Sequence, residues 1–419
     1  YIKDKKPVIF QPVFQKDGFL AAVDILEYDS KHGTYIINEV KSSNEIDEKV
    51  HFFDLAFQVN LLRRCGLNIA KINLIHLNKE YVRSGDIDLA GVFKIDNITD
   101  EINELQDQVE GEMAAAKEYL AKETEPNGYC CCITKGRSGH CTTFSHANPN
   151  VPEYSVHDIA RIGSSKRKLE ELIDSGIFHI KDIPEDMEFS EIQRNQIDSY
   201  IHDKVLIKKE EIKKELSGLV FPLYFLDYET YPCAIPRFSG FSPYQQIPFQ
   251  YSLHVVRAQN EEPEHYEFIH VGKDDPSEHL FKTLSGHIGL VGSVIVWNKK
   301  FESKINKEIG LRIPEAASFM ENVNSRIYDL MDVFSKQLYV HKDFYGSCSI
   351  KCVLPVIVPL LSYKDLEIRE GGTASQSWNT ITTGDITQKE KDVIVKNLLN
   401  YCELDTYAMY AIWNVLRKI

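Results

Sequence analysis

Short runs of apolar residues, separated by polar and turn-forming stretches, dominate the first quarter of the chain. Alternation of apolar and polar residues predicts strands, and a helical repeat covers about residues 45–65. A charged helix is expected over residues 100–124. The strand-like runs lie at 8–14, 19–28, 33–42 and 71–77. Strands in this order around one helix predict an α/β unit.

The next segments differ in character. Residues 126–150 carry Cys, Gly and Pro in a pattern that contradicts both helix and strand, and residues 151–218 show helical periodicity with short breaks. Apolar strands then return at 223–230, 250–256, 266–271 and 293–298, and a long helix over 388–416 closes the chain. We therefore expect a first α/β domain at 1–150 that includes the Cys-rich loop, a helical connector at 151–218 and a second α/β domain at 219–419.

Composition and charge narrow the class of protein. The chain has 419 residues, 43% of them hydrophobic, so two or three cores of ordinary size can form. No apolar run approaches the roughly 20 residues that cross a bilayer, so we expect no membrane partner. The net charge of −14 argues against a surface that binds any polyanion. Nucleic acid would need a local groove in which divalent metals offset the carboxylates.

The start of the chain and its cysteines give two further expectations. The first residue is Tyr1 and a strand begins almost at once, which suggests that upstream sequence is missing. Nine cysteines, distributed unevenly in a chain of this size, favour a metal site over a secreted disulfide framework. We therefore expect a cytoplasmic protein.

A first candidate site lies in the strands of the first domain. Asp24 lies near the middle of one strand-like run, and Glu39 and Lys41 stand two positions apart on the next. Residues i and i+2 of a strand share a face, so Glu39 and Lys41 project together, and a hairpin can bring Asp24 beside them. Two carboxylates can hold Mg²⁺ or Mn²⁺, while an ammonium can position or activate a water. This is the outline of a phosphodiester-hydrolysis site, although surface charges also occur at this spacing.

The helix after these strands carries FFDLAFQVNLL, which contains Gln58. The arrangement resembles the PD-(D/E)XK core of RecB-like nucleases, which has a restriction-endonuclease-like fold. The resemblance implies that Asp24 and Glu39 are metal ligands and that Lys41 and Gln58 are catalytic. Gln11 lies where that family often has an acidic residue. This departure favours the alternative of a degenerate site that only binds nucleic acid.

The loop GYCCCITKGRSGHCTTF contains four cysteines. Three adjacent cysteines cannot all face one centre, so Cys130 and Cys132 are expected to join Cys141 in a site that needs a fourth ligand. The loop resembles CRISPR-adaptation-type RecB-like nucleases, in which three cysteines after the core and one far upstream hold a 4Fe-4S cluster. The upstream cysteine would lie in the missing segment. His140 and Cys65 are substitutes for this fourth ligand, although Cys65 is interpreted as a packed helix residue. Zinc, or three reduced thiols without a metal, are the alternatives to the cluster.

A second candidate site is spread over three segments of the second domain. Asp227 and Glu229 lie on one face of the strand LYFLDYET, where buried carboxylates require a cation or a proton. Glu302 lies in NKKFE, directly after the strand SVIVW. Tyr401 and Asp405 are four residues apart and therefore share a face of the closing helix.

The order of these segments resembles the three motifs of DnaQ-like (DEDD) 3′–5′ exonucleases, which have an RNase H-like α/β fold. The resemblance implies that Asp227, Glu229 and Asp405 coordinate two metal ions and that Tyr401 orients the attacking water. Glu302 stands at the second-motif ligand position, where that family usually has Asp. Other residues here are interpreted as structural: Asp329 and Asp332 as a helix cap and a solvated acid, and His254, His270 and Trp297 as core.

A wider resemblance covers most of the chain. Residues 344–375, FYGSCSIKCVLPVIVPLLSYKDLEIREGGTAS, resemble a segment of an uncharacterised bacterial family in which a RecB-like iron–sulfur nuclease region precedes a DnaQ-like domain. Lys351 in this segment can contact a phosphate, and a simple helix cap is the alternative. The connector sequence ARIGSSKRKLEELIDSGI resembles a helix-hairpin-helix element. That resemblance implies DNA-backbone contacts from Gly163, Lys166, Arg167 and Lys168, and an ordinary basic helix face is the alternative.

Together, these features predict a metal-dependent DNA nuclease. Its second domain would be a 3′–5′ exonuclease and its first domain would hold a PD-(D/E)XK site, with Mg²⁺ or Mn²⁺ and a 4Fe-4S cluster as cofactors. Two alternatives remain at this stage: a nucleic-acid-binding scaffold with a degenerate first site, and an exonuclease that trims RNA.

Overall fold

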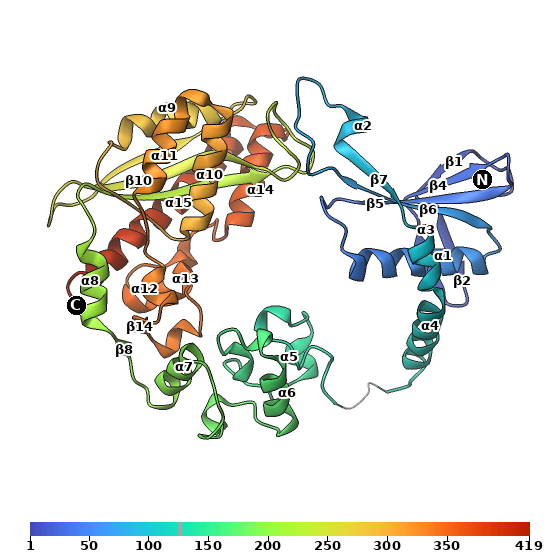
Figure 1. The fold of residues 1–419 in the computed structure, drawn as a ribbon, viewed down its shortest axis with the longest axis horizontal. Coiled ribbons are helices and arrows are strands. Elements are labelled where there is room, and N and C mark those ends of the chain that lie inside the picture. The colour runs from blue at the N-terminus through green and yellow to red at the C-terminus, as the bar shows by residue number, and fades with distance from the viewer. Residues whose placement is uncertain (125–127) are drawn as a thin grey trace. The chain divides into compact units, whose positions relative to one another are not determined.

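The computed structural model describes residues 1–124 and 128–419, which form two compact units (Figure 1). The first unit contains residues 1–124 and Pro232–Gln246, and the second contains residues 128–231 and Ile247–Ile419. Both units combine sheets with helices, which confirms the predicted α/β class. The division differs from the prediction at three places. The Cys-bearing loop belongs to the second unit, the connector is part of that same unit, and residues 232–246 belong to the first.

A five-stranded sheet organises the first unit, in the order β1-β4-β5-β6-β7. The neighbours β5 and β6 are parallel and the other pairs are antiparallel. The strands are β1 (Val8–Phe10), β4 (Ile25–Asp29), β5 (Thr34–Lys41), β6 (Ile69–Leu77) and β7 (Phe93–Asn97). A separate hairpin joins β2 (Val13–Lys16) to β3 (Phe19–Ala22). The parallel pair requires a crossover connection, and the predicted helix supplies it.

This crossover helix explains how the first unit is held together. A π-helical turn at Glu48–Phe52 leads into α1 (Phe53–Arg64), whose apolar residues recur every three or four positions and pack into the core beneath the sheet. The helix predicted over 100–124 is two helices, α3 (Thr99–Glu104) and α4 (Gln106–Leu120), which add to the same core. A short α2 (Leu89–Val92) precedes β7.

Residues 232–246 are fixed to the first unit by hydrogen bonds rather than by a strand. The Arg83 guanidinium donates to the carbonyls of Pro236 (2.9 Å) and Arg237 (2.6 Å). The backbone of Arg83 pairs with that of Gly240 and Phe241. These contacts explain why a segment expected in the second domain belongs to the first unit.

The Cys-bearing loop and the helical connector form one module of the second unit. Short helices α5 (Phe144–Ala147), α6 (Lys166–Asp174) and α7 (Glu191–Ile201) enclose a core that includes Cys132, Ile133 and Phe144 from the loop. This packing is the physical reason that the loop joins the second unit. After α7, β8 (Leu206–Ile207) pairs with β14 (Tyr339–Val340), and α8 (Lys209–Ser217) leads to the larger sheet.

A second five-stranded sheet has the order β11-β10-β9-β12-β13. The strands β9 (Leu223–Pro232), β12 (Ser293–Val296) and β13 (Ile327–Asp329) are parallel neighbours, whereas β10 (Gln246–Val256) and β11 (Glu264–Ile269) are antiparallel. The four predicted strands are present, and β13 is an addition. The closing helix α15 spans Gln388–Leu416, as the periodicity predicts.

Alternation along β9 separates the two faces of this sheet. Tyr224, Leu226 and Tyr228 enter a core with α9 (Ser277–His287), α10 (Lys299–Arg312) and α11 (Ala317–Ser325), which lie together on one side (Figure 1). Phe225 lies on the other face, where its ring contacts Tyr410 and Trp413 of α15. Residues two positions apart share a face, so the carboxylates of β9 also face α15.

The remaining helices are α12 (Asp332–Ser335), α13 (Ile350–Ile357) and α14 (Gly371–Thr383), and both α13 and α14 contact α15. In the described ranges, no helix is both long enough and apolar enough to span a membrane.

Candidate functional site

The second unit gathers four carboxylates from three elements. Asp227 and Glu229 lie on β9, and Glu302 lies in the first turn of α10, which begins just after β12. The strands β9 and β12 are parallel neighbours, so their carboxyl ends lie at the same edge of the sheet. A side-chain hydrogen bond joins Glu302 to Asp227, and the charge of Asp405 on α15 raises the pKa of both β9 carboxyls. The three predicted motifs therefore converge.

The start of α10 is fixed by an acid from the neighbouring strand. Asp329 accepts hydrogen bonds from the backbone N–H groups of the N-cap and the first residue of α10, at 3.2 and 2.8 Å. The helix cap predicted for Asp329 is therefore present, although it caps α10 as well as its own turn. One turn further along, Tyr228 donates to Asn306 Oδ1 at 2.8 Å and ties α10 to β9. Glu302 is held between these two anchors.

On α15, Tyr401 and Asp405 are both buried. Tyr363 donates a hydrogen bond of 2.5 Å to Asp405 Oδ1, and its ring centre lies 6.3 Å from that of Tyr401. Tyr363 was not among the predicted site residues. It lies in the segment 344–375 noted above, but in a short turn whose periodicity does not show which side chain faces α15.

Cys402 is a second site residue that was not predicted from the sequence. Its Sγ lies 3.8 Å from Asp227 Oδ2, and one ligand atom from each of Asp227, Glu229 and Cys402 lies within 4.8 Å of the others. The available signal was its position three residues before Asp405, which places it near the same face of α15.

Burial governs the electrostatics of this site. It raises the pKa of Asp227, Glu229 and Glu302 well above their ordinary values, and repulsion between the carboxylates adds to the effect. Burial also raises the pKa of Asp405 to about 6, against the opposing hydrogen bond from Tyr363. Among the described residues, Glu302 Oε2 is buried with no hydrogen-bond partner. A buried cluster of carboxylates requires bound protons or a cation, and carboxylate oxygens are ligands that suit Mg²⁺ or Mn²⁺.

Lys351 of α13 brings a positive charge to this group. Its Nζ lies 5.6 Å from the ring centre of Tyr401 and 5.8 Å from that of Tyr363, and it donates to the Arg369 carbonyl at 2.6 Å. Its charge lowers the pKa of Asp405. The structure thus places Lys351 beside the carboxylates, and the N-cap of α13 makes no side-chain hydrogen bond that would support a simple cap.

In the first unit, the hairpin of β4 and β5 brings Asp24 beside Glu39. Asp24 Oδ2 accepts the backbone N–H of the residue between Glu39 and Lys41 at 2.9 Å. Asp24 Oδ1 accepts from Gln11 Nε2 at 2.8 Å, so Gln11 occupies an oxygen of a predicted ligand. Glu39 is buried, and its Oε2 has no hydrogen-bond partner within the described part of the chain. Burial raises the pKa of Glu39.

Helix α1 completes this first group. Lys41 forms ion pairs with Glu39, at 2.8 Å, and with Asp54. Gln58 is buried and donates to Asp54 Oδ1 at 3.3 Å. The structure therefore brings together the predicted residues Asp24, Glu39, Lys41 and Gln58. It adds Asp54, whose signal in the sequence was its position one helical turn before Gln58.

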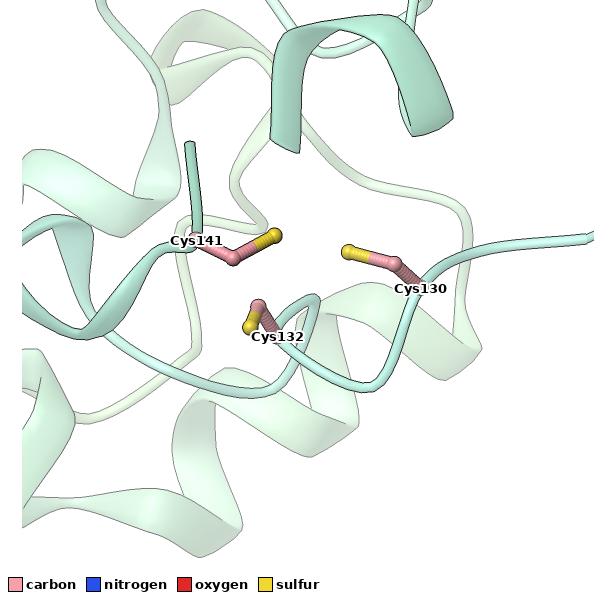
Figure 2. Close-up of side chains that lie close together, drawn as sticks. All are labelled: Cys130, Cys132 and Cys141. Atoms are coloured by element: carbon pink, nitrogen blue, oxygen red, sulfur yellow. The ribbon is translucent and has the colours of Figure 1, made fainter. Parts of the chain in front are cut away.

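Cys130, Cys132 and Cys141 also converge, with their Sγ atoms within 4.8 Å of one another (Figure 2). The sulfurs of Cys130 and Cys141 point toward each other (Figure 2). His140, one candidate for a fourth ligand, has a buried Nδ1 with no hydrogen-bond partner in the described residues. Cys65 packs against the core of the first unit, as expected for a structural residue.

The basic residues of the connector are not equivalent. Gly163 lies in the turn at Ile162–Ser164, just before α6 begins at Lys166. Lys166 and Arg167 are exposed, whereas Lys168 donates to the Glu188 carbonyl and lies over the Phe189 ring. All three line an open pocket of about 770 Å³.

Of the residues interpreted as core, only His254 is fully buried. Trp297 is half-buried and donates a hydrogen bond to the Cys348 carbonyl. His270 is half-buried and hydrogen-bonded to Asp274. Asp332 pairs with Lys336 at 3.0 Å, as a partly solvated acid does.

The similarity to known proteins covers only part of the second unit. Residues 224–349 match the model of a family described as a domain of unknown function (DUF2779). The matched segment contains Asp227, Glu229 and Glu302 and ends before Tyr401 and Asp405. No curated protein and no solved structure matches the chain. Over less than half of its length, the chain is therefore similar to a family whose description names no activity.

Proposed function

We propose that the chain is a metal-dependent nuclease whose second unit removes nucleotides from the 3′ ends of DNA, through a DnaQ-like site on an RNase H-like domain. One observation carries the proposal. Asp227, Glu229, Glu302 and Asp405, which come from three separate sequence motifs, meet beside Tyr401. The match to a domain of unknown function neither adds an activity nor opposes one.

The donor set fits Mg²⁺ or Mn²⁺ because it consists of carboxylates, one of which has a buried oxygen without a partner in the described residues. Bound there, two ions would activate a water and stabilise the leaving 3′-oxygen. Asp227, Glu229 and Asp405 would hold them, with Glu302 as a further ligand.

The other polar groups of the site have separate tasks. The buried hydroxyl of Tyr401 would orient the attacking water. Tyr363 fixes the orientation of Asp405 through its 2.5 Å hydrogen bond to Oδ1. Lys351 would contact a phosphate oxygen, because its ammonium is the cationic partner of the carboxylate group.

The test uses a single-stranded DNA labelled and blocked at its 5′ end, with Mg²⁺ or Mn²⁺. We expect Asp227→Ala and Asp405→Ala to abolish release of mononucleotides from the 3′ end. Tyr401→Phe should lower the rate by about 10²-fold, because it removes an orienting group and leaves the ligands in place. Glu302→Asp should be tolerated and Glu302→Ala should not.

The matched control is Asp392→Ala, which removes an exposed carboxylate from the same helix. It should leave the rate unchanged. Full exonuclease activity in Asp227→Ala would overturn the assignment. Duplex DNA and RNA substrates in the same assay distinguish DNA resection from RNA trimming.

The proposal extends to a PD-(D/E)XK nuclease site in the first unit, at Asp24, Glu39, Lys41 and Gln58. Glu39 Oε2, which has no hydrogen-bond partner among the described residues, supports a bound cation. Two observations favour the alternative of a site that only binds nucleic acid. Gln11 occupies one oxygen of Asp24, and Lys41 is held between two carboxylates.

We also propose that Cys130, Cys132 and Cys141 hold a 4Fe-4S cluster, with zinc as the alternative. Three converging thiols provide most of the ligands that either centre takes. Such a centre would stabilise the Cys-bearing loop within its helical module.

A further inference from the structure

A second cluster of metal-ligating side chains, which shares no residue with the carboxylate group, lies on the same face of the large sheet. His254 on β10 and His265 on β11 are directly opposite each other in the antiparallel pair. Glu403 of α15 lies beside them, with a carboxylate oxygen 3.8 Å from His265 Nδ1. One ligand atom from each of the three residues lies within 4.8 Å of the others.

The hydrogen bonds around this cluster determine which ring nitrogens are available. His254 Nδ1 lies 2.8 Å from Thr406 Oγ1, and His265 Nε2 lies 3.0 Å from Ser252 Oγ. The two hydroxyls lie 2.7 Å apart, and Thr406 donates its proton to the Glu403 carbonyl at 3.1 Å.

Each hydroxyl has one proton, so a single arrangement satisfies all four contacts. The Thr406 proton goes to the Glu403 carbonyl, and the Ser252 proton must therefore go to Thr406. Both hydroxyl oxygens then accept from the imidazoles. In this arrangement the neutral rings keep bare lone pairs at His254 Nε2 and His265 Nδ1.

We propose that His254, His265 and Glu403 form a zinc site that is distinct from the proposed nuclease site and does not depend on it. Two imidazoles and one carboxylate, with a fourth position open to solvent, are a common zinc ligand set. Each imidazole donates its other N–H to an oxygen, here a hydroxyl, and metal-bound histidines are commonly oriented by such an N–H donation to an oxygen acceptor. Imidazole ligands favour zinc over Mg²⁺ or Mn²⁺, which separates this site from the carboxylate group.

The position of the site indicates what the ion does. Its ligands come from β10, β11 and α15, and the side chains of His265 and Glu403 are 24% and 49% exposed, so an ion can enter from solvent. Bound zinc would clamp α15 onto the two antiparallel strands. The same helix carries Tyr401 and Asp405, so zinc would stabilise the element on which the carboxylate group depends.

The experiment measures zinc content and thermal stability of the full chain after dialysis against micromolar free Zn²⁺. We expect His265→Ala and Glu403→Gln each to bind one equivalent less than the wild type. Both variants should also lose a zinc-dependent rise in Tm of about 5 °C. Glu403→Gln changes a half-exposed side chain without loss of volume, so it tests the site even if His265→Ala folds poorly.

His279→Ala is the matched control, because His279 is a 55% exposed histidine that pairs with Asp274 outside this cluster. It should bind as much zinc as the wild type. If His265→Ala and Glu403→Gln match this control in both zinc content and Tm rise, the site does not exist. The readouts do not involve nuclease activity, so failure of this inference and failure of the proposed function are distinguishable.

Discussion

Lys351 stands among groups of opposite charge, and this position determines what its loss would change. Its Nζ lies over the rings of Tyr401 and Tyr363 and lowers the pKa of Asp405 and Glu229. A neutral side chain at this position would lower neither pKa. The pH dependence of the reaction therefore separates a role of the Lys351 charge from a purely structural role.

We expect Lys351→Met to lower kcat/KM for 3′-end release by about 10²-fold, because an electrostatic contact to a charged transition state is lost. The acid limb of the pH–rate profile should move to higher pH, since the pKa of Asp405 rises when the ammonium is removed. Lys351→Arg should restore part of both losses. Lys364→Met, which changes an exposed lysine of the neighbouring turn, is the control. An unchanged rate and profile in Lys351→Met would exclude the contact.

The buried carboxylates also make stability depend on pH. The folded pKa of Asp405 is about 6, above its unfolded value of 3.8, so its protonated form is favoured by folding. Its contribution to the free energy of unfolding is fully present below about pH 4 and is lost as pH rises through about 6. This contribution is on the order of 3 kcal/mol for Asp405 alone. Asp227, Glu229 and Glu302 act in the same direction.

We therefore expect the Tm of metal-free protein to fall as pH is raised from about 5 to about 8, and Mn²⁺ to restore it at the higher pH. Thermal unfolding with EDTA or with Mn²⁺ measures this directly. In Asp405→Asn the fall should be smaller, because one titrating group is gone. A metal-free Tm that rises over this range in the wild type would contradict the raised pKa values.

Among the elements, the Cys-bearing loop depends most on tertiary contacts. Its short helical turns are too brief to be stable alone. Cys132, Ile133 and Phe144 anchor it in the core of the helical module, while Cys130 and Cys141 lie nearer the surface. A metal centre would add a crosslink between the two ends of the loop.

We expect protein purified without oxygen to be brown, and Cys141→Ser to remove the colour and make residues 128–150 sensitive to protease. The reason is that one of three converging ligands is lost. Cys131→Ser, which changes an exposed cysteine outside the group, should keep both properties. Colourless wild-type protein with one equivalent of zinc at these cysteines would replace the cluster by a zinc site.

At the level of the whole chain, the two proposed nuclease sites lie in separate compact units, each with its own core. Substitutions without shared contacts act independently. We expect Asp24→Ala or Lys41→Ala to remove one metal-dependent activity and leave 3′-end release intact. The double variant Asp24→Ala with Asp227→Ala should have no activity. An Asp24→Ala variant that lost every activity, or none, would show that the first site is not an independent nuclease.

Much of this molecule follows from local sequence. The period of the apolar residues predicts most strands of both sheets, though not β7 or β13, and the bounds of α15, because one face of each element must be buried. The i, i+2 spacing of Asp227 with Glu229 and of Glu39 with Lys41 fixes which side chains share a face. Short-range geometry of this kind does not depend on the rest of the fold.

Other features depend on which elements pack together. Tyr363, Cys402 and Asp54 join the two sites only because helices and turns distant in sequence pack against the strands that carry the motifs. The Cys-bearing loop joins the second unit because its apolar residues share a core with α6 and α7. His254 reads as a core residue in sequence, yet its opposite neighbour His265 and the packing of α15 place it in a candidate metal site. Strand register and helix packing depend on contacts between residues far apart in sequence. They are determined by which apolar faces are buried across the whole unit, and the spacing of residues along the chain does not specify them.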